Sequence, residues 1–200
     1  ACAIDSRIIL DSRSTGYVYQ YPHLVITPYP ARYTIPWRLS DGTEVILRPI
    51  RPEDEPLEHE LLSSLSQETM RTRFFSIIKD ITHEMLIRFC NIDYEREMAI
   101  IAELKKESGS KKIIGIGRLI IEPDLRSCEY AVLVHDNYHG KGLGYKLVDM
   151  LIGIAQDKGL EEIYGIVLSE NTKMLKVARK LGFSVKWMPD GVSRVTLALK

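Results

Sequence analysis

The run from His139 to Gly144 limits the possible folds of this chain more than any other stretch, because it places three glycines between a predicted strand and a predicted helix. The strand is the apolar run 129–134, and the helix begins near Leu143 with apolar residues at helical spacing. Glycines allow a tight turn and the close approach of a ligand. The helix N-terminus offers unpaired N–H groups and a positive dipole end, and Lys141 adds a positive charge at the rim. The sequence therefore predicts a binding site for a phosphate-bearing molecule.

The spacing of these glycines disfavours two common nucleotide motifs. A P-loop needs Gly-x-x-x-x-Gly-Lys followed by Ser or Thr, and no hydroxyl residue stands at that place. The dinucleotide fingerprint needs Gly-x-Gly-x-x-Gly, whereas this loop reads Gly-x-Gly-x-Gly. Glu161 and Glu162 stand about twenty residues on, where a ribose-binding acid is expected, but they precede the predicted strand 163–168 instead of ending it. A plain strand-to-helix connector stays open as the alternative to a ligand site.

Patterning along the chain predicts one domain of mixed α and β structure. Asp41-Gly42 between 37–39 and 44–48 is a strong hairpin signal. Helices are expected from 53 to about 65, at 67–75, and after an N-cap at Thr82 as far as Cys90. The later elements follow as strands 98–104, 113–121 and 129–134, helix 143–158, strand 163–168, helix 172–181, and strands 183–187 and 192–199.

Residues 129–183 resemble the acyl-CoA-binding core of the GNAT superfamily of N-acetyltransferases. The pyrophosphate loop of that family reads Gln/Arg-x-x-Gly-x-Gly/Ala, and His139-x-x-Gly142-x-Gly144 matches it except at the first position. The stretch from Asn171 ends a helix with Gly182-Phe183 leading into a strand, as the family does. The resemblance covers residues 37–200. It implies the α/β (α+β) GNAT fold, with a mixed, largely antiparallel central sheet flanked by helices, and acetyl-CoA as cosubstrate without a metal.

Glu129 is the candidate catalytic base. Acetyl transfer to an amine requires a proton acceptor, and a carboxylate beside an apolar run would have a raised pKa suited to that task. A solvated strand-end acid, or an ion-pair partner of Arg118 or Arg126, is the alternative interpretation. Protein acetyltransferases of the synthetase-linked GNAT type have a catalytic Glu on this strand, and the match over 129–132 implies the same role here. Glu103 on a neighbouring strand is the second candidate.

The resemblance also implies which residues bind acetyl-CoA. Main-chain groups of the strand would hold the pantetheine arm, amides of the loop would hold the pyrophosphate, and an Asn that is equally suited to cap a helix would contact CoA. One departure concerns Ala178, where many members have a Tyr that protonates the leaving thiolate, so the general acid is unassigned. The residues expected to contact CoA are Val132, Leu133, Val134, His139, Gly140, Lys141, Gly142, Leu143, Gly144, Tyr145 and Asn171.

Residues 1–36 differ in character from the rest, because tyrosines alternate with prolines that disfavour helices and interior strands. We interpret this stretch as an extended segment or linker. Residues 3–11 also resemble the closing strand of the ATP-grasp domain in ADP-forming acyl-CoA synthetases. The chain begins with Ala1, and we expect it to be the C-terminal part of a longer polypeptide in which a synthetase-like region precedes the GNAT domain.

The amino-acid composition limits the classes of partner molecule and the compartments that we expect for this chain. Lys plus Arg and Asp plus Glu are equal at 27 each, so no bulk charge favours nucleic acid or an anionic membrane. No apolar run is long enough to span a bilayer, and the N-terminus shows no signal-peptide pattern. The three cysteines are widely spaced, which suits thiols in a reducing cytoplasm. Nothing in the sequence indicates an oligomeric state.

The combined expectation is an acetyl-CoA-dependent N-acetyltransferase that acetylates lysine side chains of protein substrates by direct attack. Two alternatives stay open. One is a small-molecule amine N-acetyltransferase, which would use the same donor site. The other is a non-catalytic acyl-CoA sensor that regulates an attached synthetase module, and Ala178 together with the N-terminal segment motivates it.

Overall fold

The computed structural model describes residues 28–75, 80–105 and 109–199, so most of the predicted segment 1–36 lies outside the described residues. Within them, eight strands form one sheet in the order β1-β2-β3-β4-β5-β6-β8-β7. The strands are β1 (Ile35–Arg38), β2 (Glu44–Pro49), β3 (Glu97–Lys105), β4 (Lys111–Ile121), β5 (Ser127–Val134), β6 (Glu162–Leu168), β7 (Ser184–Trp187) and β8 (Val192–Ala198). The helices are α1 (Glu55–Ser63), α2 (Gln67–Phe74), α3 (His83–Cys90), α4 (Leu143–Asp157) and α5 (Thr172–Lys180).

Local sequence signals explain where several elements begin. In the β1–β2 hairpin, Thr43 N–H donates to Asp41 Oδ1 at 3.0 Å, and Gly42 adopts a φ of +91° that an L residue would find strained. The predicted N-cap at Thr82 is confirmed, because its Oγ1 accepts a hydrogen bond from Met85 N–H at 3.2 Å. The predicted order of elements is confirmed as well. β1 begins at Ile35, slightly before the predicted strand, because the hairpin register extends to Ile35 opposite Leu47.

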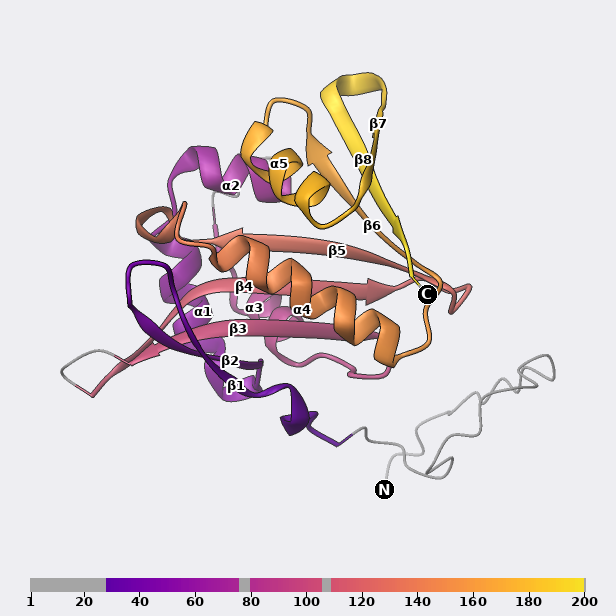
Figure 1. Ribbon diagram of the computed structural model, residues 1–200. Coiled ribbons are helices and arrows are strands. Elements are labelled where there is room, and N and C mark those ends of the chain that lie inside the picture. The colour runs from indigo at the N-terminus through magenta and orange to yellow at the C-terminus, as the bar shows by residue number, and fades with distance from the viewer. Residues whose placement is uncertain (1–27, 76–79, 106–108, 200) are drawn as a thin grey trace.

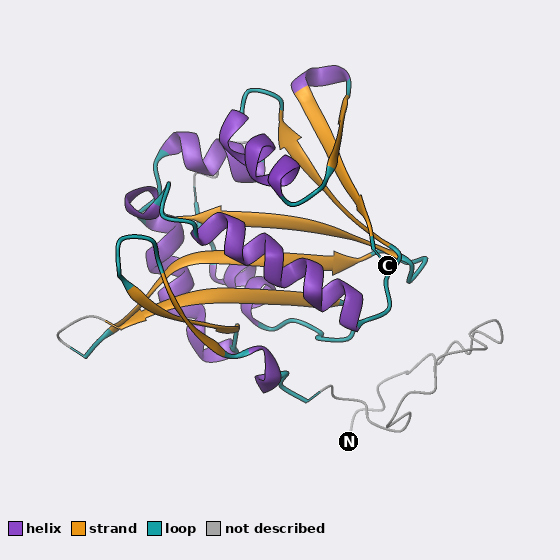
Figure 2. Cartoon of the chain, in the orientation of Figure 1, coloured by secondary structure: helices purple, strands orange, loops and turns teal. Residues whose placement is uncertain are grey.

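Helices cover both faces of the sheet (Figures 1 and 2). The first face carries α4 and α5, whose apolar side chains form one buried cluster with side chains such as Leu47, Tyr130 and Val195. The second face carries α1, α2 and α3, which bury Ile101 and Leu133 against Leu61, among others. We call these the α4/α5 face and the α1–α3 face. Because successive side chains of a strand point to opposite faces, the central strands β3, β4 and β5 contribute to both clusters.

The pairing between β5 and β6 is the feature of the sheet that matters most for function. These neighbours run parallel, and the remaining pairs within the described sheet are antiparallel. Their pairing covers only Ser127 with Glu162, Cys128 with Ile163 and Glu129 with Tyr164, after which the strands diverge (Figure 1). We call the divergent parts, Tyr130–Val134 and Gly165–Leu168, the β5–β6 fork. The fork leaves one backbone edge of each strand without a strand partner there.

The described end of the N-terminal segment packs against β2 and α4 through two tyrosines. Tyr29 Oη donates to the carbonyl of Pro49 at 2.8 Å, and the Arg51 guanidinium lies 4.5 Å from the centre of the Tyr29 ring. Tyr33 Oη donates to Asp157 at 3.1 Å. These contacts hold the chain at the start of β1, and the division into segments 1–36 and 37–200 stays a prediction. No helix among the described residues is long and apolar enough to cross a membrane.

Candidate active site

The loop before α4 presents a row of unused backbone donors. The N-cap Gly142 has a φ of +86° and Gly140 a φ of +74°, and no side chain caps the helix. Within the described residues, no hydrogen bond engages the N–H groups of residues 140–145, and Lys146 N–H donates to the Gly142 carbonyl at 3.0 Å. The first turn also contains no acid. Free N–H groups and the helix dipole together make this loop suited to a phosphate group.

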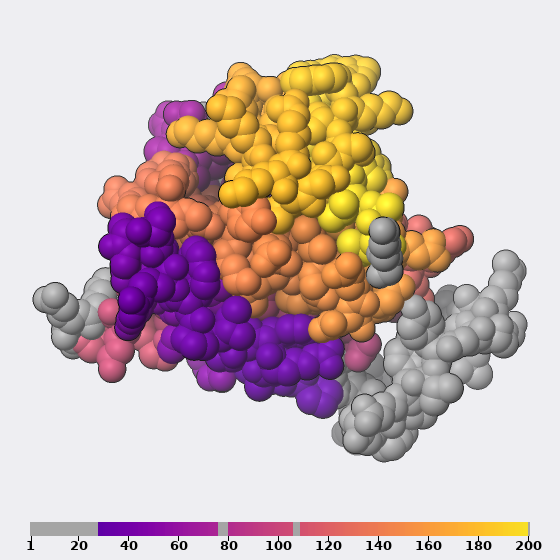
Figure 3. Space-filling view, in the orientation of Figure 1, coloured from indigo at the N-terminus to yellow at the C-terminus, as the bar shows by residue number. Residues whose placement is uncertain are grey.

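Contacts with the end of β5 and with the β1–β2 hairpin hold the loop in place. The His139 ring contacts the Val134 carbonyl through Nε2 at 2.8 Å. Ser40 N–H donates to the Lys141 carbonyl at 3.2 Å, and Lys141 Nζ lies 2.9 Å from Asp41 Oδ2. Figure 3 shows the N-terminal hairpin lying beside α4 on the same surface. The positive charge that we expected of Lys141 at the rim is therefore paired with the hairpin, and the backbone supplies the attraction for an anion.

Asp136 ties the same loop to the start of α2. Its carboxylate accepts hydrogen bonds from Ser66 N–H at 2.9 Å, from Ser66 Oγ at 2.7 Å and from Thr69 Oγ1 at 2.7 Å. Partial burial alone would raise the pKa of Asp136, but these hydrogen bonds outweigh it and lower the pKa to about 2. The ionised carboxylate therefore stabilises the folded chain.

Replacing Asp136 with Ala should lower the free energy of unfolding by about 1–2 kcal/mol at pH 7, because three charge-assisted hydrogen bonds are lost at a partly exposed site. The folded-state pKa is depressed, so this contribution is present above the ordinary carboxyl pKa of about 4 and disappears as the pH falls toward about 2. Thermal melts from pH 7 to pH 2 measure both effects. A wild-type and variant difference that stays constant over this range would contradict the assignment.

The β5 edge of the fork carries free main-chain groups of the predicted strand. His135 N–H donates to the Ile114 carbonyl, so it faces β4. Because backbone groups alternate between the two sides of a strand, Leu133 also faces β4, whereas Val132 and Val134 face the fork. The Val134 carbonyl is already used by the His139 ring, but its N–H has no partner among the described residues. The Leu133 side chain is buried on the α1–α3 face.

Glu129 stands at the base of the fork and points to the α1–α3 face. The two arginines that could have neutralised it are engaged elsewhere: Arg126 contacts Glu161 at 2.6 Å, and Arg118 contacts Glu58 at 2.6 Å. Within the described residues Glu129 has no ion pair. Burial raises the pKa of its carboxyl, and the neighbouring Glu122 raises it further, against an opposing effect of two arginines. A carboxylate in this state can accept a proton from a bound amine.

Four residues around Glu129 were not identified from the sequence. Arg73 on α2 and Arg194 on β8 act electrostatically on the carboxyl. Burial and the charge of Arg118 hold the pKa of Arg73 below its ordinary value. The hydroxyl of Tyr164 donates to Glu122, and the Arg194 guanidinium lies 3.8 Å from the centre of the Tyr164 ring. These residues come from separate elements, so no spacing in the sequence brings them together.

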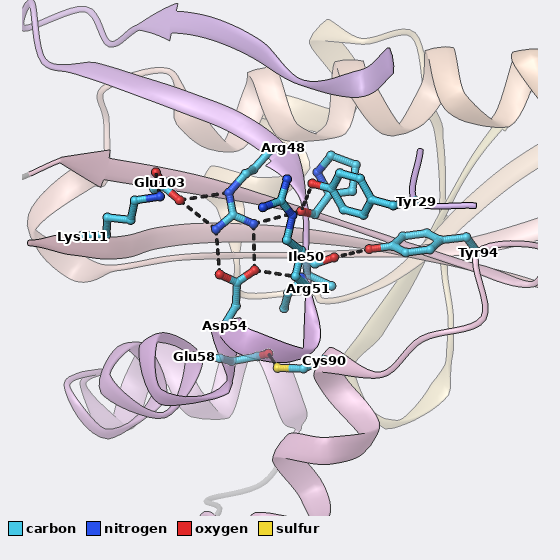
Figure 4. A network of polar contacts seen from close by, with 11 residues as sticks. Tyr29, Arg48, Ile50, Arg51, Asp54, Glu58, Cys90, Tyr94, Glu103 and Lys111 are labelled. Carbon is cyan, nitrogen blue, oxygen red and sulfur yellow. Dashed lines mark hydrogen bonds and ion pairs between the residues drawn. The ribbon is translucent and has the colours of Figure 1, made fainter. Parts of the chain in front are cut away.

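Glu103, the second candidate base, is part of a buried ion-pair network (Figure 4). Its carboxylate accepts from Arg48 at 2.7 Å and contacts Lys111 Nζ at 3.0 Å, while Arg48 also binds Asp54 through both terminal nitrogens. Burial would raise the pKa of Glu103, but hydrogen bonds from Lys111 and Arg48 lower it. Glu103 is therefore a poor proton acceptor, and the network joins β2, β3 and the turn before α1.

Asn171 and Ala178 lie at the N-cap and in the body of α5, the helix that follows β6 in the chain. The Oδ1 of Asn171 accepts from Met174 N–H at 3.1 Å, so Asn171 caps α5, which is one of the two roles that the sequence left open. Ala178 is fully buried on the face of α5 that packs on the sheet. Among the described residues, no group of three or more His, Cys, Asp or Glu side chains could hold a metal ion.

A family model described as an acetyltransferase (GNAT) domain matches residues 44–184. This chain belongs to the GNAT acetyltransferases. The mixed, mostly antiparallel sheet flanked by helices is the GNAT fold, as the sequence predicted, and the enzyme is an N-acetyltransferase with acetyl-CoA as cosubstrate.

Several known GNAT proteins are similar to this chain. An acetyltransferase of Pseudomonas aeruginosa is 34% identical over 157 residues, which cover 78% of this chain and 84% of that protein. The acetyltransferase Pat of Mycolicibacterium smegmatis is 29% identical over 149 residues, which cover 74% of this chain but only 44% of that protein. The solved GNAT domain of S. lividans PAT has a TM-score of 0.77 and 26% identity, covering 86% of this chain and 99% of that domain.

The described residues fit acetyl-CoA. The N–H groups of residues 140–145 form an anion cradle, and Gly140 has no atom within 4 Å of the place where a Cβ would stand. The free edge of β5 can receive an extended amide-containing arm as an added strand. The cradle follows the C-terminal end of β5, at the open end of the fork, and the free edge leads from there toward Glu129 at its base.

Proposed function

We propose that this GNAT domain transfers the acetyl group of acetyl-CoA to lysine side chains of protein substrates by direct attack of the amine. One observation carries the choice of site: Glu129, a carboxyl with a raised pKa and no ion pair among the described residues, lies at the base of the fork. The acetyl group would be supplied by acetyl-CoA bound at the fork.

The binding roles divide between the loop and the fork. The N–H groups of residues 140–145 would hold the pyrophosphate, with His139 fixing the loop to the end of β5. Val132 and Val134 would supply main-chain groups to the pantetheine arm, and Leu133 between them would anchor the strand through its buried side chain. Asn171 would contact CoA from the start of α5 while keeping its capping hydrogen bond.

The two faces of the sheet would have separate tasks. The loop that would bind the phosphates directly precedes α4 on the α4/α5 face, whereas the Glu129 side chain points to the α1–α3 face. An acceptor amine would therefore approach from the α1–α3 face and lose its proton to Glu129, directly or through a water molecule. The free amine would then attack the carbonyl carbon of the thioester. No covalent enzyme intermediate is required for this reaction. Holding both substrates in line at the fork would supply much of the rate enhancement, because the attack then becomes effectively intramolecular.

The openness of the acceptor side favours a protein substrate. Ile120, the cross-strand neighbour of Glu129 on the same face, is 50% exposed. Arg194 and Glu162 nearby are also partly exposed. Small-molecule sites are usually enclosed, whereas a lysine on a protein can reach across an open surface. The resemblance of residues 129–132 to synthetase-linked protein acetyltransferases supports the same choice.

The same resemblance supports the proposed setting of the domain. We propose that a synthetase-like region precedes it in a longer polypeptide, and that it works in the cytoplasm. Cys90 and Cys128 are buried free thiols, which is consistent with a reducing compartment.

An acetylation assay with labelled acetyl-CoA tests the choice of acceptor. Purified chain should acetylate lysines of a candidate protein, such as an acyl-CoA synthetase, and should act only slowly on small amines. Efficient acetylation of a small amine without modification of any protein lysine would overturn the lysine proposal in favour of a small-molecule enzyme. Binding of acetyl-CoA without turnover on either class would instead indicate a sensor.

A further inference from the structure

The hydroxyl of Tyr130 is a buried polar group that the roles above leave unused. Tyr130 is only 3% exposed, and its Oη has no hydrogen-bond partner among the residues that the structure describes. Buried hydroxyl groups are nearly always hydrogen-bonded, because a donor taken out of water without a partner costs free energy. The unused hydroxyl therefore points to a partner that comes with the substrate.

The ring of Tyr130 lies at the base of the β5–β6 fork. Tyr130 is the first β5 residue beyond the last pair with β6, which joins Glu129 to Tyr164. A Cβ on Gly165, the next residue of β6, would lie 2.8 Å from Cε1 of the Tyr130 ring. Only glycine leaves room for the ring at that position. On its other side the ring packs on Phe183, with ring centres 5.3 Å apart.

Glu129 and Tyr130 are consecutive residues of β5, so their side chains point to opposite faces of the sheet. Glu129 faces the α1–α3 side and Tyr130 the α4/α5 side. The acceptor amine would arrive on the first side. A pantetheine arm that runs from the loop along Val132 and Val134 would end at the base of the fork, and we place the thioester sulfur there, beside the Tyr130 ring. The two residues therefore flank the reacting carbonyl from opposite faces.

We infer that Tyr130 is a catalytic residue whose hydroxyl donates a hydrogen bond to the thioester sulfur as the C–S bond breaks. Before that step Glu129 has taken one proton from the ammonium form of the acceptor, and the free amine has bonded to the carbonyl carbon; the second N–H proton passes to water as the amide forms. The C–S electron pair passes to sulfur, and the resulting thiolate leaves as such or takes a proton from water. The residues of α5 in the same cluster, Leu175 and Ala178, have no hydroxyl that could do this.

The surroundings of Tyr130 agree with a donor role. Burial raises the pKa of its hydroxyl, so the group keeps its proton and can donate a hydrogen bond to an anionic sulfur. The inference rests on acetyl transfer from acetyl-CoA and holds for any amine acceptor. Its test therefore uses whichever acceptor gives the highest rate, so that failure of the lysine proposal is a separate outcome.

Tyr130→Phe removes the hydroxyl and keeps the ring. We expect kcat to fall about tenfold or more, because the lost interaction forms as charge develops on sulfur. The KM for acetyl-CoA should change less than about twofold, and the melting temperature should stay equal or rise. Tyr33→Phe, which removes an exposed hydroxyl remote from the fork, is the matched control and should leave kcat unchanged.

Two further measurements separate catalysis from packing. With the seleno analogue of acetyl-CoA, whose selenolate leaves more readily, the deficit of Tyr130→Phe should shrink. The thiol of bound CoA, followed by the ultraviolet absorbance of its thiolate, should ionise at lower pH in the wild type than in Tyr130→Phe. An unchanged kcat, a loss confined to the KM for acetyl-CoA, or equal ionisation of bound CoA in both proteins would overturn the assignment.

Discussion

Replacing Glu129 with Gln should lower kcat/KM for acetyl transfer by about 10²–10⁴-fold at pH 7, because the general base is lost while the shape of the side chain is kept. The affinity for acetyl-CoA should stay within about threefold of the wild type, since the cradle at residues 140–145 is untouched. The folded chain should be equally or more stable. The raised pKa of Glu129 means that its ionised form costs stability above the ordinary carboxyl pKa, and Gln removes that cost.

The pH dependence gives this variant a distinctive signature. Glu129 accepts a proton only when it is ionised, so wild-type activity should rise with pH through the raised pKa of this carboxyl. The residual activity of Glu129→Gln should rise only as the acceptor amine loses its own proton, near pH 10 for lysine. The ratio of the two rates should therefore be largest at low pH. Glu161→Gln is the control, because Glu161 pairs with Arg126 away from the fork, and it should keep wild-type kinetics.

A constant ratio between wild type and Glu129→Gln across this pH range would contradict the role of Glu129 as a base. It would instead indicate that the carboxylate positions the acceptor. Initial rates at saturating acetyl-CoA from pH 6 to pH 10 distinguish these two cases.

An acid placed in the loop should abolish most of the affinity for acetyl-CoA. Gly140 adopts a φ of +74° that Asp and Asn tolerate better than other side chains, and no atom lies within 4 Å of its Cβ position. In Gly140→Asp the new carboxylate would face the pyrophosphate, and we expect the KM for acetyl-CoA to rise roughly 30-fold or more. The kcat at saturation should change little.

Gly140→Asn is the matched control for this substitution. It carries nearly the same shape without the charge, so its KM should stay within a few-fold of the wild type. Gly140→Asp should also be equally or more stable than Gly140→Asn, because an anion at the positive end of α4 is favourable. The charge effect on KM should weaken at high salt. Equal KM values for the two variants would mean that the phosphates bind elsewhere.

Much of the fold could be predicted from signals that depend only on residues close together in the sequence. The capping side chains of Thr82 and Asn171, the Asp41-Gly42 turn and the apolar periodicity of α4 depend on neighbouring residues alone, so they were predictable. The glycine pattern at residues 140–144 was informative for the same reason. Its backbone conformation is local, and the free N–H groups follow from the start of a helix.

The surroundings of the site were less predictable because tertiary contacts decide them. Lys141 could be placed at the loop, but its pairing with Asp41 depends on where the β1–β2 hairpin lies. Likewise, Arg118 and Arg126 looked equally able to neutralise Glu129, and each has a different acidic partner in the structure. Alternation along a strand places Tyr130 opposite Glu129, but the isolation of its hydroxyl depends on everything packed around it.

The most direct test of the account is a crystal structure of the chain with bound CoA. We expect pyrophosphate oxygens on the N–H groups of residues 140–145 and the pantetheine arm along the free edge of Val132 and Val134. The sulfur should lie beside the Tyr130 hydroxyl, with Glu129 facing it from the opposite side of the sheet. Phosphates bound away from the loop, or a sulfur remote from Glu129, would contradict the account.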